Sequence, residues 1–473
     1  MSIPPEILAV ERPSGTKVKK NGNHYDVIKR TSVYKDGRRV PKDLGKVGEI
    51  VDGKYVPRKK EAIPSMDYGD IDILDYGRIG LCHRVGKDIL DSLRNVFSES
   101  DSETIYSIAL LRSAYGNITD RDLKYRYDTS YLSVILPDVS LSEARVCRFL
   151  EILGGNYLKT VDYMKNVLKE RDADTVTVVD GMLKDTTGKD SGFVQWSRKS
   201  RLKGTKEISI LYAFDLKKKE PLCHKVYPGN MLDMTSFSDF IDTFDLRECT
   251  VMGDKGFLSA ENLLSLKERD VHYVMPLKRS DSRIGKYALL DFAETFRDGD
   301  DVIEAVKKNV DGLYYYCYRS SFDSSNERRC YLANAEKKKT YDSKAFGKKE
   351  SRFGIICFVS DQDLDPKDVY SMYDRRWEIE TFFGFYKNIV SLSSVRVQGD
   401  RSIIGTEFIN MLSSVISSRV KKLFIEKELN RTYSYSQIMS YLDQPKKIRK
   451  PDGSWADSHT VKYIQELKTT LGI

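Results

Sequence analysis

Four side chains of different chemistry recur at a regular spacing around Trp377. Tyr373, Arg376, Glu380 and Lys387 follow the pattern Y-x2-R-x3-E-x6-K. On one continuous helix they fall within roughly 60° of each other, so a single face presents a phenol, a guanidinium, a carboxylate and an ammonium. A salt-bridged surface helix has the same spacing, so the spacing alone leaves a catalytic and a structural interpretation open.

Two aspartates elsewhere follow apolar runs that predict buried strands. Residues 175–179 are β-branched and continuous, which predicts a central strand ending at Asp180-Gly181. Residues 249–253 form a second short apolar run, which ends at Asp254. An aspartate in such a turn is usually structural, so neither position alone predicts catalysis.

These segments together resemble the DDE transposases of the insertion-sequence-four group. All four signature positions match in type and spacing, and two aspartate segments match as well. Further similar segments are Tyr227-Pro228-Gly229-Asn230 with Asp233, and Met275-Pro276-Leu277-Lys278. The aspartate segments are Val178-Val179-Asp180-Gly181 and Gly253-Asp254-Lys255-Gly256-Phe257. The resemblance spans about residues 174–420.

The resemblance implies a ribonuclease H-like core and a catalytic, metal-binding set of Asp180, Asp254 and Glu380. Three convergent carboxylates repel one another, and hard divalent cations with oxygen ligands offset that repulsion. We therefore expect Mg²⁺, with Mn²⁺ as a substitute, and two ions that assist an in-line displacement at phosphorus.

The same resemblance implies DNA-binding roles for Tyr373, Arg376 and Lys387. Arginine can grip a phosphate with two donors, and lysine acts as a point charge. Lys255 is a further candidate for DNA contact, with simple exposure as the alternative. Members of the group commonly form a DNA hairpin on the transposon end, helped by a flipped base that stacks on a Trp of the insertion. All three tryptophans lie outside residues 281–350, which leaves Tyr315 or Phe346 as candidates for that role.

The surrounding elements predict an α/β protein with several parts. Two parts come first: a small basic β region at 1–60, a candidate for DNA contact, and an α-helical domain at 85–170, a candidate for DNA end binding. The catalytic domain follows at 174–280 and 352–425, interrupted by a β-rich insertion at 281–351. A C-terminal helical tail at 426–473 is a candidate for dimerisation.

Local signals support these parts. Asn21-Gly22, Asp36-Gly37 and Asp52-Gly53 predict hairpins in the basic region, where a solvated ribbon is an equal alternative to DNA contact. In the helical region, Asn117 and Asp120 are expected as turn or capping residues.

Two further local expectations concern the second half of the chain. The lysine-rich, weakly hydrophobic segment from Lys337 to Lys349 is expected to form an exposed loop. A long helix is expected to start near Pro366 and to run to about residue 389.

Composition limits the partners and the cellular compartment that we expect for this protein. The net charge of +8 permits a polyanionic partner without requiring one. The seven cysteines contain no Cys-x-x-Cys pair, which favours free thiols in a reducing compartment. The sequence shows no secretion signal or membrane span, so we expect a cytoplasmic protein, nucleoid-associated in a prokaryote. It has no Walker motif, so nucleotide hydrolysis is not indicated.

The leading hypothesis is a cut-and-paste transposase. It would bind terminal inverted repeats and target DNA, both double-stranded, as a homodimer on DNA. One alternative is a ribonuclease H-like nuclease that cuts without joining. The other is a non-catalytic DNA-binding repressor with the same fold.

Overall fold

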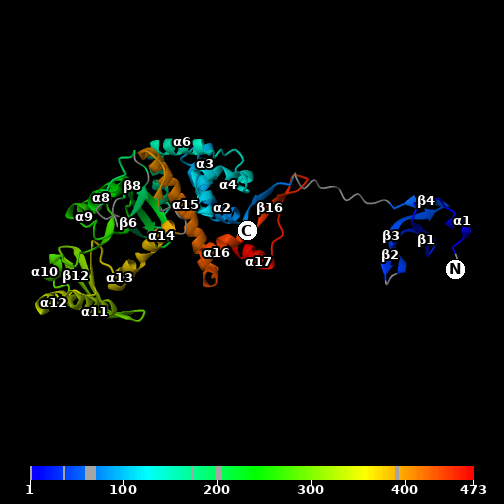
Figure 1. The fold of residues 1–473 in the computed structure, drawn as a ribbon. Helices are drawn as coiled ribbons and strands as arrows, with labels where there is room; N and C mark the ends of the chain where they lie inside the picture. The colour runs from blue at the N-terminus through cyan, green and yellow to red at the C-terminus, as the bar shows by residue number, and fades with distance from the viewer. Residues whose placement is uncertain are drawn as a thin grey trace. The chain divides into compact units, whose positions relative to one another are not determined.

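The structure is a computed structural model that describes residues 3–35, 38–58, 71–116, 118–172, 175–186, 188, 190–197, 205–388 and 394–473. The chain divides into two compact units, Met1–Ile71 and Asp72–Ile473, whose elements are labelled in Figure 1. The predicted turn or cap at Asn117 and the predicted hairpin turn at Asp36-Gly37 lie outside the described residues.

The first unit is a four-stranded antiparallel sheet in the order β1-β2-β3-β4. Its elements are α1 (Pro5–Leu8), β1 (Thr16–Asn21), β2 (His24–Lys35), β3 (Arg38–Val51) and β4 (Lys54–Pro57). The hairpins predicted at Asn21-Gly22 and Asp52-Gly53 are confirmed, because β1 pairs with β2 and β3 with β4 across these turns. Val18, Val27 and Ile50 form its small core.

Helices open the second unit and pack around one long helix, α15 (Asp400–Glu426). They are α2 (Gly77–Arg94), α3 (Glu99–Tyr115), α4 (Asp120–Asp128), α5 (Leu132–Ile135), α6 (Glu143–Gly155) and α7 (Tyr157–Lys169). Their apolar side chains, among them Ile89, Leu90 and Leu93 of α2, are buried. The residue at the N-cap of α4 is Thr119, and Asp120 is its first helical residue.

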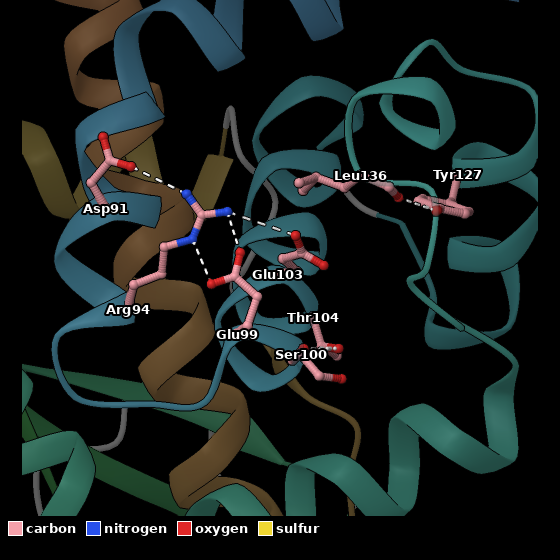
Figure 2. Close-up of polar contacts among 8 residues, drawn as sticks. All are labelled: Asp91, Arg94, Glu99, Ser100, Glu103, Thr104, Tyr127 and Leu136. Carbon is pink, nitrogen blue, oxygen red and sulfur yellow. Dashed lines mark hydrogen bonds and ion pairs between the residues drawn. The ribbon is translucent and has the colours of Figure 1, made fainter.

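An arginine ties the corner between α2 and α3 together (Figure 2). Arg94 donates to Asp91 over 3.3 Å and to Glu99 over 3.0 Å, and its guanidinium lies 3.7 Å from Glu103. Ser98 caps α3 by accepting from the Asp101 amide. Burial raises the pKa of Glu103, and the negative charge of Glu99 adds to that effect.

The large sheet of the second unit begins with three antiparallel strands and continues with two parallel ones. In the order β8-β7-β6-β9-β10, the strands β9 and β10 run parallel to β6. Their bounds are β6 (Val176–Thr186), β7 (Glu207–Asp215), β8 (Glu220–Pro228), β9 (Thr250–Met252) and β10 (His272–Pro276). The helices α8 (Asp233–Thr243) and α9 (Ala260–Glu268) connect the later strands.

Residues 281–351 do not form a separate sheet, because their strands extend the same one. Beyond β10 the order is β14-β13-β12-β11, all antiparallel. The strands are β11 (Glu294–Asp298), β12 (Asp301–Val310), β13 (Leu313–Ser320) and β14 (Ile355–Ser360), with the short helix α10 (Ser282–Lys286) before them. A short strand, β15 (Ser394–Val395), pairs with β6.

Most of the exposed loop predicted from Lys337 to Lys349 is helical: the segment is exposed, but two helices occupy all of it except residues 339–342. They are α11 (Ser321–Lys338) and α12 (Ser343–Glu350). Lysines close both helices: Lys337 and Lys338 in the last turn of α11, Lys348 and Lys349 in that of α12. Lysine is a good helix former and suits a helix C-terminus, so low hydrophobicity here reflects exposure rather than a loop.

The single long helix predicted from Pro366 is also wrong, because it is divided at Arg376. The two helices are α13 (Pro366–Arg375) and α14 (Trp377–Asn388). At the junction the Arg376 amide donates to the Tyr373 carbonyl over 3.0 Å, and Ile379 donates to Arg376 over 3.1 Å. These i to i−3 bonds replace the α-helical pattern.

The C-terminal residues return to the start of the second unit. The strands β17 (Trp455–Asp457), β16 (Lys446–Arg449) and β5 (Ile73–Asp75) form a small sheet, flanked by α16 (Tyr435–Tyr441) and α17 (Lys462–Leu471). Within the described residues, no helix is both long and apolar enough to cross a membrane.

Two glycines allow α6 and α15 to cross at close range. A Cβ at Gly154 would lie 1.8 Å from the Arg401 carbonyl oxygen, and one at Gly405 would lie 2.2 Å from that of Leu150. Backbone atoms cannot move aside as a flexible side chain can, so this crossing requires glycine on both helices.

We expect Gly154→Ala and Gly405→Ala each to lower the free energy of unfolding by about 1–3 kcal/mol, because the added methyl overpacks the crossing. Gly384→Ala in α14 is the control, since nothing lies within 4 Å of its Cβ position. Urea denaturation of the full chain should find this control neutral or stabilised by up to about 1 kcal/mol. Equal effects at all three positions would contradict the close crossing.

Candidate active site

Asp180 lies in the middle of β6, not at its end as predicted. The strand continues to Thr186, and its ladder with β7 extends to the pair Asp185–Glu207. The Asp-Gly turn signal fails because Met182 and Lys184 are buried and hold the chain in the sheet. The parallel pairing of β6 with β9 stops at Val178, so the sheet opens beside Asp180.

The environment of Asp180 disfavours its charge. Its carboxylate accepts from the Gly181 amide over 2.8 Å. Burial, together with the charges of Asp254 and Glu380, raises the pKa of Asp180 to about 6, although the Gly181 amide and Arg376 oppose the rise. A buried carboxyl with acidic neighbours is the setting in which a bound cation would restore the charged form.

Asp254 follows β9 and faces the same opening. Both aspartates line a cavity of about 200 Å³ between β6, β7 and the start of α8. Phe257 fixes the turn after Asp254: its amide donates to the Asp254 carbonyl over 2.9 Å, and its ring stacks on Phe237 at 4.8 Å. Lys255 lies exposed in this turn.

Glu380 is connected to Asp180 through Arg376. The Arg376 guanidinium donates to Glu380 over 2.6 Å and to Asp180 over 3.4 Å. Arg376 sits at the junction of α13 and α14, so the division of the helix places its side chain between the two carboxylates. Asp180 therefore neighbours both other acids chosen from the sequence: Asp254 lines the same cavity, and Glu380 lies on the other side of Arg376.

Arg376 supplies the positive charge between these acids in this structure. Among the described residues, no group of three or more His, Cys, Asp or Glu side chains has an arrangement ready to hold a metal ion. All three acids offer carboxylate oxygens, which hard divalent cations prefer. A cation shared by Asp180 and Glu380 would require the Arg376 guanidinium to move aside.

The other signature residues lie near the acids but face protein atoms. The Tyr373 ring packs on Phe358 at 5.0 Å, and Arg376 lies over that tyrosine ring at 5.5 Å. Lys387 donates to the Leu183 carbonyl of β6 over 2.8 Å. Their predicted contact with DNA stays a prediction.

One candidate for base stacking in the insertion is wrong. Tyr315 is only 3% exposed and packs on Tyr287 at 4.9 Å, because β13 is buried on both faces from Tyr315 to Tyr318. Phe346 is half-buried among Tyr331, Tyr341 and Phe353, and its predicted role stays a prediction.

A fourth acid beside the site had a weaker signal in the sequence. Asp233 begins α8 and lines the same cavity as Asp180 and Asp254. Its carboxylate lies 2.6 Å from the Cβ position of Gly256, next to Asp254, so that glycine is needed for the approach. The segment Tyr227-Pro228-Gly229-Asn230 with Asp233 had marked this region, but no role followed from it.

A buried ion pair below the site had no signal in the sequence. Lys184 of β6 and Glu407 of α15 are both fully buried, with the ammonium 2.7 and 2.9 Å from the two carboxylate oxygens. Tyr386 of α14 donates to Glu407 over 3.1 Å, and Asn410 does the same over 3.1 Å. Asn410 accepts from Arg112 of α3 over 2.8 Å, so the network reaches the helical region.

We expect Lys184→Met to lower the free energy of unfolding by about 3–5 kcal/mol, because it leaves the Glu407 carboxylate buried without its partner. The double variant Lys184→Met/Glu407→Gln removes both charges and keeps an acceptor for Tyr386. Urea denaturation should find this double variant more stable than the single one. A single variant as stable as the wild type would contradict a paired, buried Glu407.

Comparison with known proteins identifies the family. Residues 171–409 match the family described as the transposase DDE domain, and this match covers half of the chain. The chain therefore belongs to the DDE transposases. It is an enzyme that acts on DNA by transesterification, and members of this class use divalent metal ions.

Other comparisons add context. No curated protein matches the chain. A solved structure entitled "Cryo-EM structure of piggyBac transposase synaptic complex with hairpin DNA" is similar, with 10% sequence identity and a TM-score of 0.41. The similarity covers 78% of this chain and 80% of that chain.

We expect Asp180→Asn to stabilise the metal-free protein above pH 6. The native carboxyl, with its pKa near 6, keeps a proton that the unfolded chain releases near its ordinary value of 3.8. Stability of the wild type therefore falls as pH rises between these values, by up to about 3 kcal/mol, and the Asn variant lacks this fall. Thermal unfolding from pH 4 to pH 8 without divalent ions measures the difference.

Asp245→Asn is the control, because Arg247 lowers the pKa of that exposed carboxyl to about 2. Its difference from the wild type should stay constant between pH 5 and pH 8. Added Mg²⁺ should raise the unfolding temperature of the wild type and leave Asp180→Asn unchanged. Equal responses in both would remove Asp180 from a metal site.

Proposed function

We propose that this chain is a cut-and-paste transposase of the insertion-sequence-four group, with Asp180, Asp254 and Glu380 as its catalytic acids. The observation that supports the proposal is the position of Asp180, which shares Arg376 with Glu380 and lines one cavity with Asp254, although 200 residues separate Asp180 from Glu380. The strand order β8-β7-β6-β9-β10 supports a ribonuclease H-like core, with Asp180 on its first strand.

The proposed cofactor is Mg²⁺, with Mn²⁺ as a substitute and two ions in the site. The donors fit, because all are carboxylate oxygens around a partly buried space with excess negative charge. When bound, the ions would activate the attacking oxygen and stabilise the leaving one. Asp180, Asp254 and Glu380 would hold them, and Asp233 lines the same cavity as the two aspartates.

In this proposal Arg376 changes partners. A cation that takes over the carboxylates frees the guanidinium, which can then bind a DNA phosphate with two donors. Tyr373, Lys387 and the exposed Lys255 are the proposed neighbours of the DNA backbone. A hairpin intermediate on the transposon end stays open, with Phe346 as the remaining predicted aromatic of the insertion.

The proposed substrates are terminal inverted repeats and target DNA. Because two ends must be joined, we propose a homodimer on DNA. We assign one role to each part of the chain. Residues 1–60 contact DNA, and residues 85–170 bind the transposon ends. Residues 174–280 and 352–425, on either side of the insertion at 281–351, perform catalysis, and residues 426–473 form the dimer contact. The proposed place of action is the cytoplasm, at the nucleoid in a prokaryote.

We expect Asp254→Asn to lower cleavage and joining by at least about a thousandfold, while binding of DNA stays within a few fold. The substrate is linear DNA that carries the sequences flanking the gene, tested with Mg²⁺ and separately with pre-cut 3′ ends. Asp245→Asn, an exposed aspartate of the same unit, is the matched control and should retain activity.

The outcomes separate the alternatives. Cleavage without joining of pre-cut ends by the wild type would favour the nuclease. Binding by the wild type with neither reaction would favour the repressor. Full activity of Asp254→Asn would overturn the proposed site.

A further inference from the structure

The first unit carries a projecting two-stranded ribbon. Strand β1 covers β2 only as far as Lys29, and β4 covers β3 only from Gly48 onward. From the pair Arg30–Asp43 to the pair Lys35–Arg38, β2 and β3 therefore pair with each other alone, apart from the Arg30 amide, which donates to the Gly15 carbonyl over 2.8 Å. This segment, called the ribbon arm below, spans about 20 Å at the usual rise per residue.

The ribbon arm is not packed against the small core of its unit. Residues 30–33 and 38–43 of the arm are exposed, whereas the core residues Val18, Val27 and Ile50 lie at the other end of the strands. Register shifts after Val27 and Lys29 bend the arm where it leaves the sheet. A two-stranded ribbon with neither face covered is only marginally stable in water, so a partner would stabilise it.

The charge of the arm selects the chemistry of that partner. Residues 30–35 and 38–43 contain five basic side chains and one acidic one, Asp43. Lys17 and Arg30 both pair with Asp43, at 2.5 and 3.2 Å, so its negative charge is compensated. The remaining excess is positive, which favours a polyanion and opposes pairing with a second copy of this arm.

One face of the arm combines cations with an apolar centre. Directly paired residues share a face, so Thr31 lies with Lys42, and Val33 lies with Val40, with Arg38 on the same face. Val33 and Val40 are 39% and 41% exposed. Charged residues and Pro41 at the edge of a sheet can be explained as protection against aggregation. That explanation does not cover the exposed pair Val33–Val40 between the cations.

We propose that the ribbon arm binds duplex DNA in the major groove, with the Thr31–Val33–Val40–Lys42 face toward the bases. This inference rests on the proposed function. The major groove, about 12 Å wide, admits a two-stranded ribbon. Methyl groups of threonine and valine suit the thymine methyl, while Arg38 and Lys42 suit guanine edges or phosphates.

The test compares two double charge reversals in the full chain, without divalent ions. Arg38→Glu/Lys42→Glu changes the arm, and Lys19→Glu/Lys20→Glu changes two exposed lysines of β1 in the same unit. The probe is a fluorescent 30-base-pair duplex of mixed sequence, titrated at several salt concentrations. We expect the arm variant to bind at least about tenfold more weakly and to lose about 2 from the salt slope, with a smaller change in the control.

Dimethyl sulfate footprinting identifies the groove. The wild type should protect guanine N7, which faces the major groove, and the arm variant should lose this protection while thermal unfolding stays unchanged. Equal affinity of the two variants, protection of adenine N3 alone, or an arm-dependent change in oligomeric state without DNA would overturn the proposal. Failure of the wild type to bind any duplex would instead overturn the proposed function itself.

Discussion

The active end of this protein depends on a fully buried ion pair. Lys184 and Glu407 join β6 to α15, and Tyr386 adds α14 to the same carboxylate. Asp180 lies four residues before Lys184, and Glu380 lies six before Tyr386, so one network anchors both elements that carry those acids. Since an unpaired buried charge costs several kcal/mol, these elements cannot shift separately without a large loss of stability.

Near that ion pair, the acids of the active site interact unfavourably with one another. Asp180 is held where its ionised form is disfavoured, with Asp254 and Glu380 nearby. Arg376 balances part of the charge from a position created by the division between α13 and α14. The Lys184–Glu407 pair fixes these elements in place, whereas the disfavoured charge of Asp180 lowers the stability of the fold. Such a loss of stability is common at catalytic sites.

Much of the site could be predicted from sequence because its signals are local. Spacing and resemblance selected Asp180, Asp254, Glu380 and Arg376, and the structure brings them together. The errors also have physical causes. Asp180-Gly181 gave a turn signal that pairing with β7 overrides, and the wheel for residues 373–387 assumed a helix without the junction at Arg376. Lys184 could not be found, since a lone lysine in a strand normally indicates exposure.

The continuation of the sheet into β13, β12 and β11 has a consequence for engineering. β14 exchanges backbone hydrogen bonds with β10 on one side and with β13 on the other, and most of its side chains are buried. A shortened chain that lacked residues 281–351 would end its sheet on β14 and leave a bare apolar edge there. Such edges recruit other chains, so truncation would yield an aggregating protein rather than a minimal enzyme.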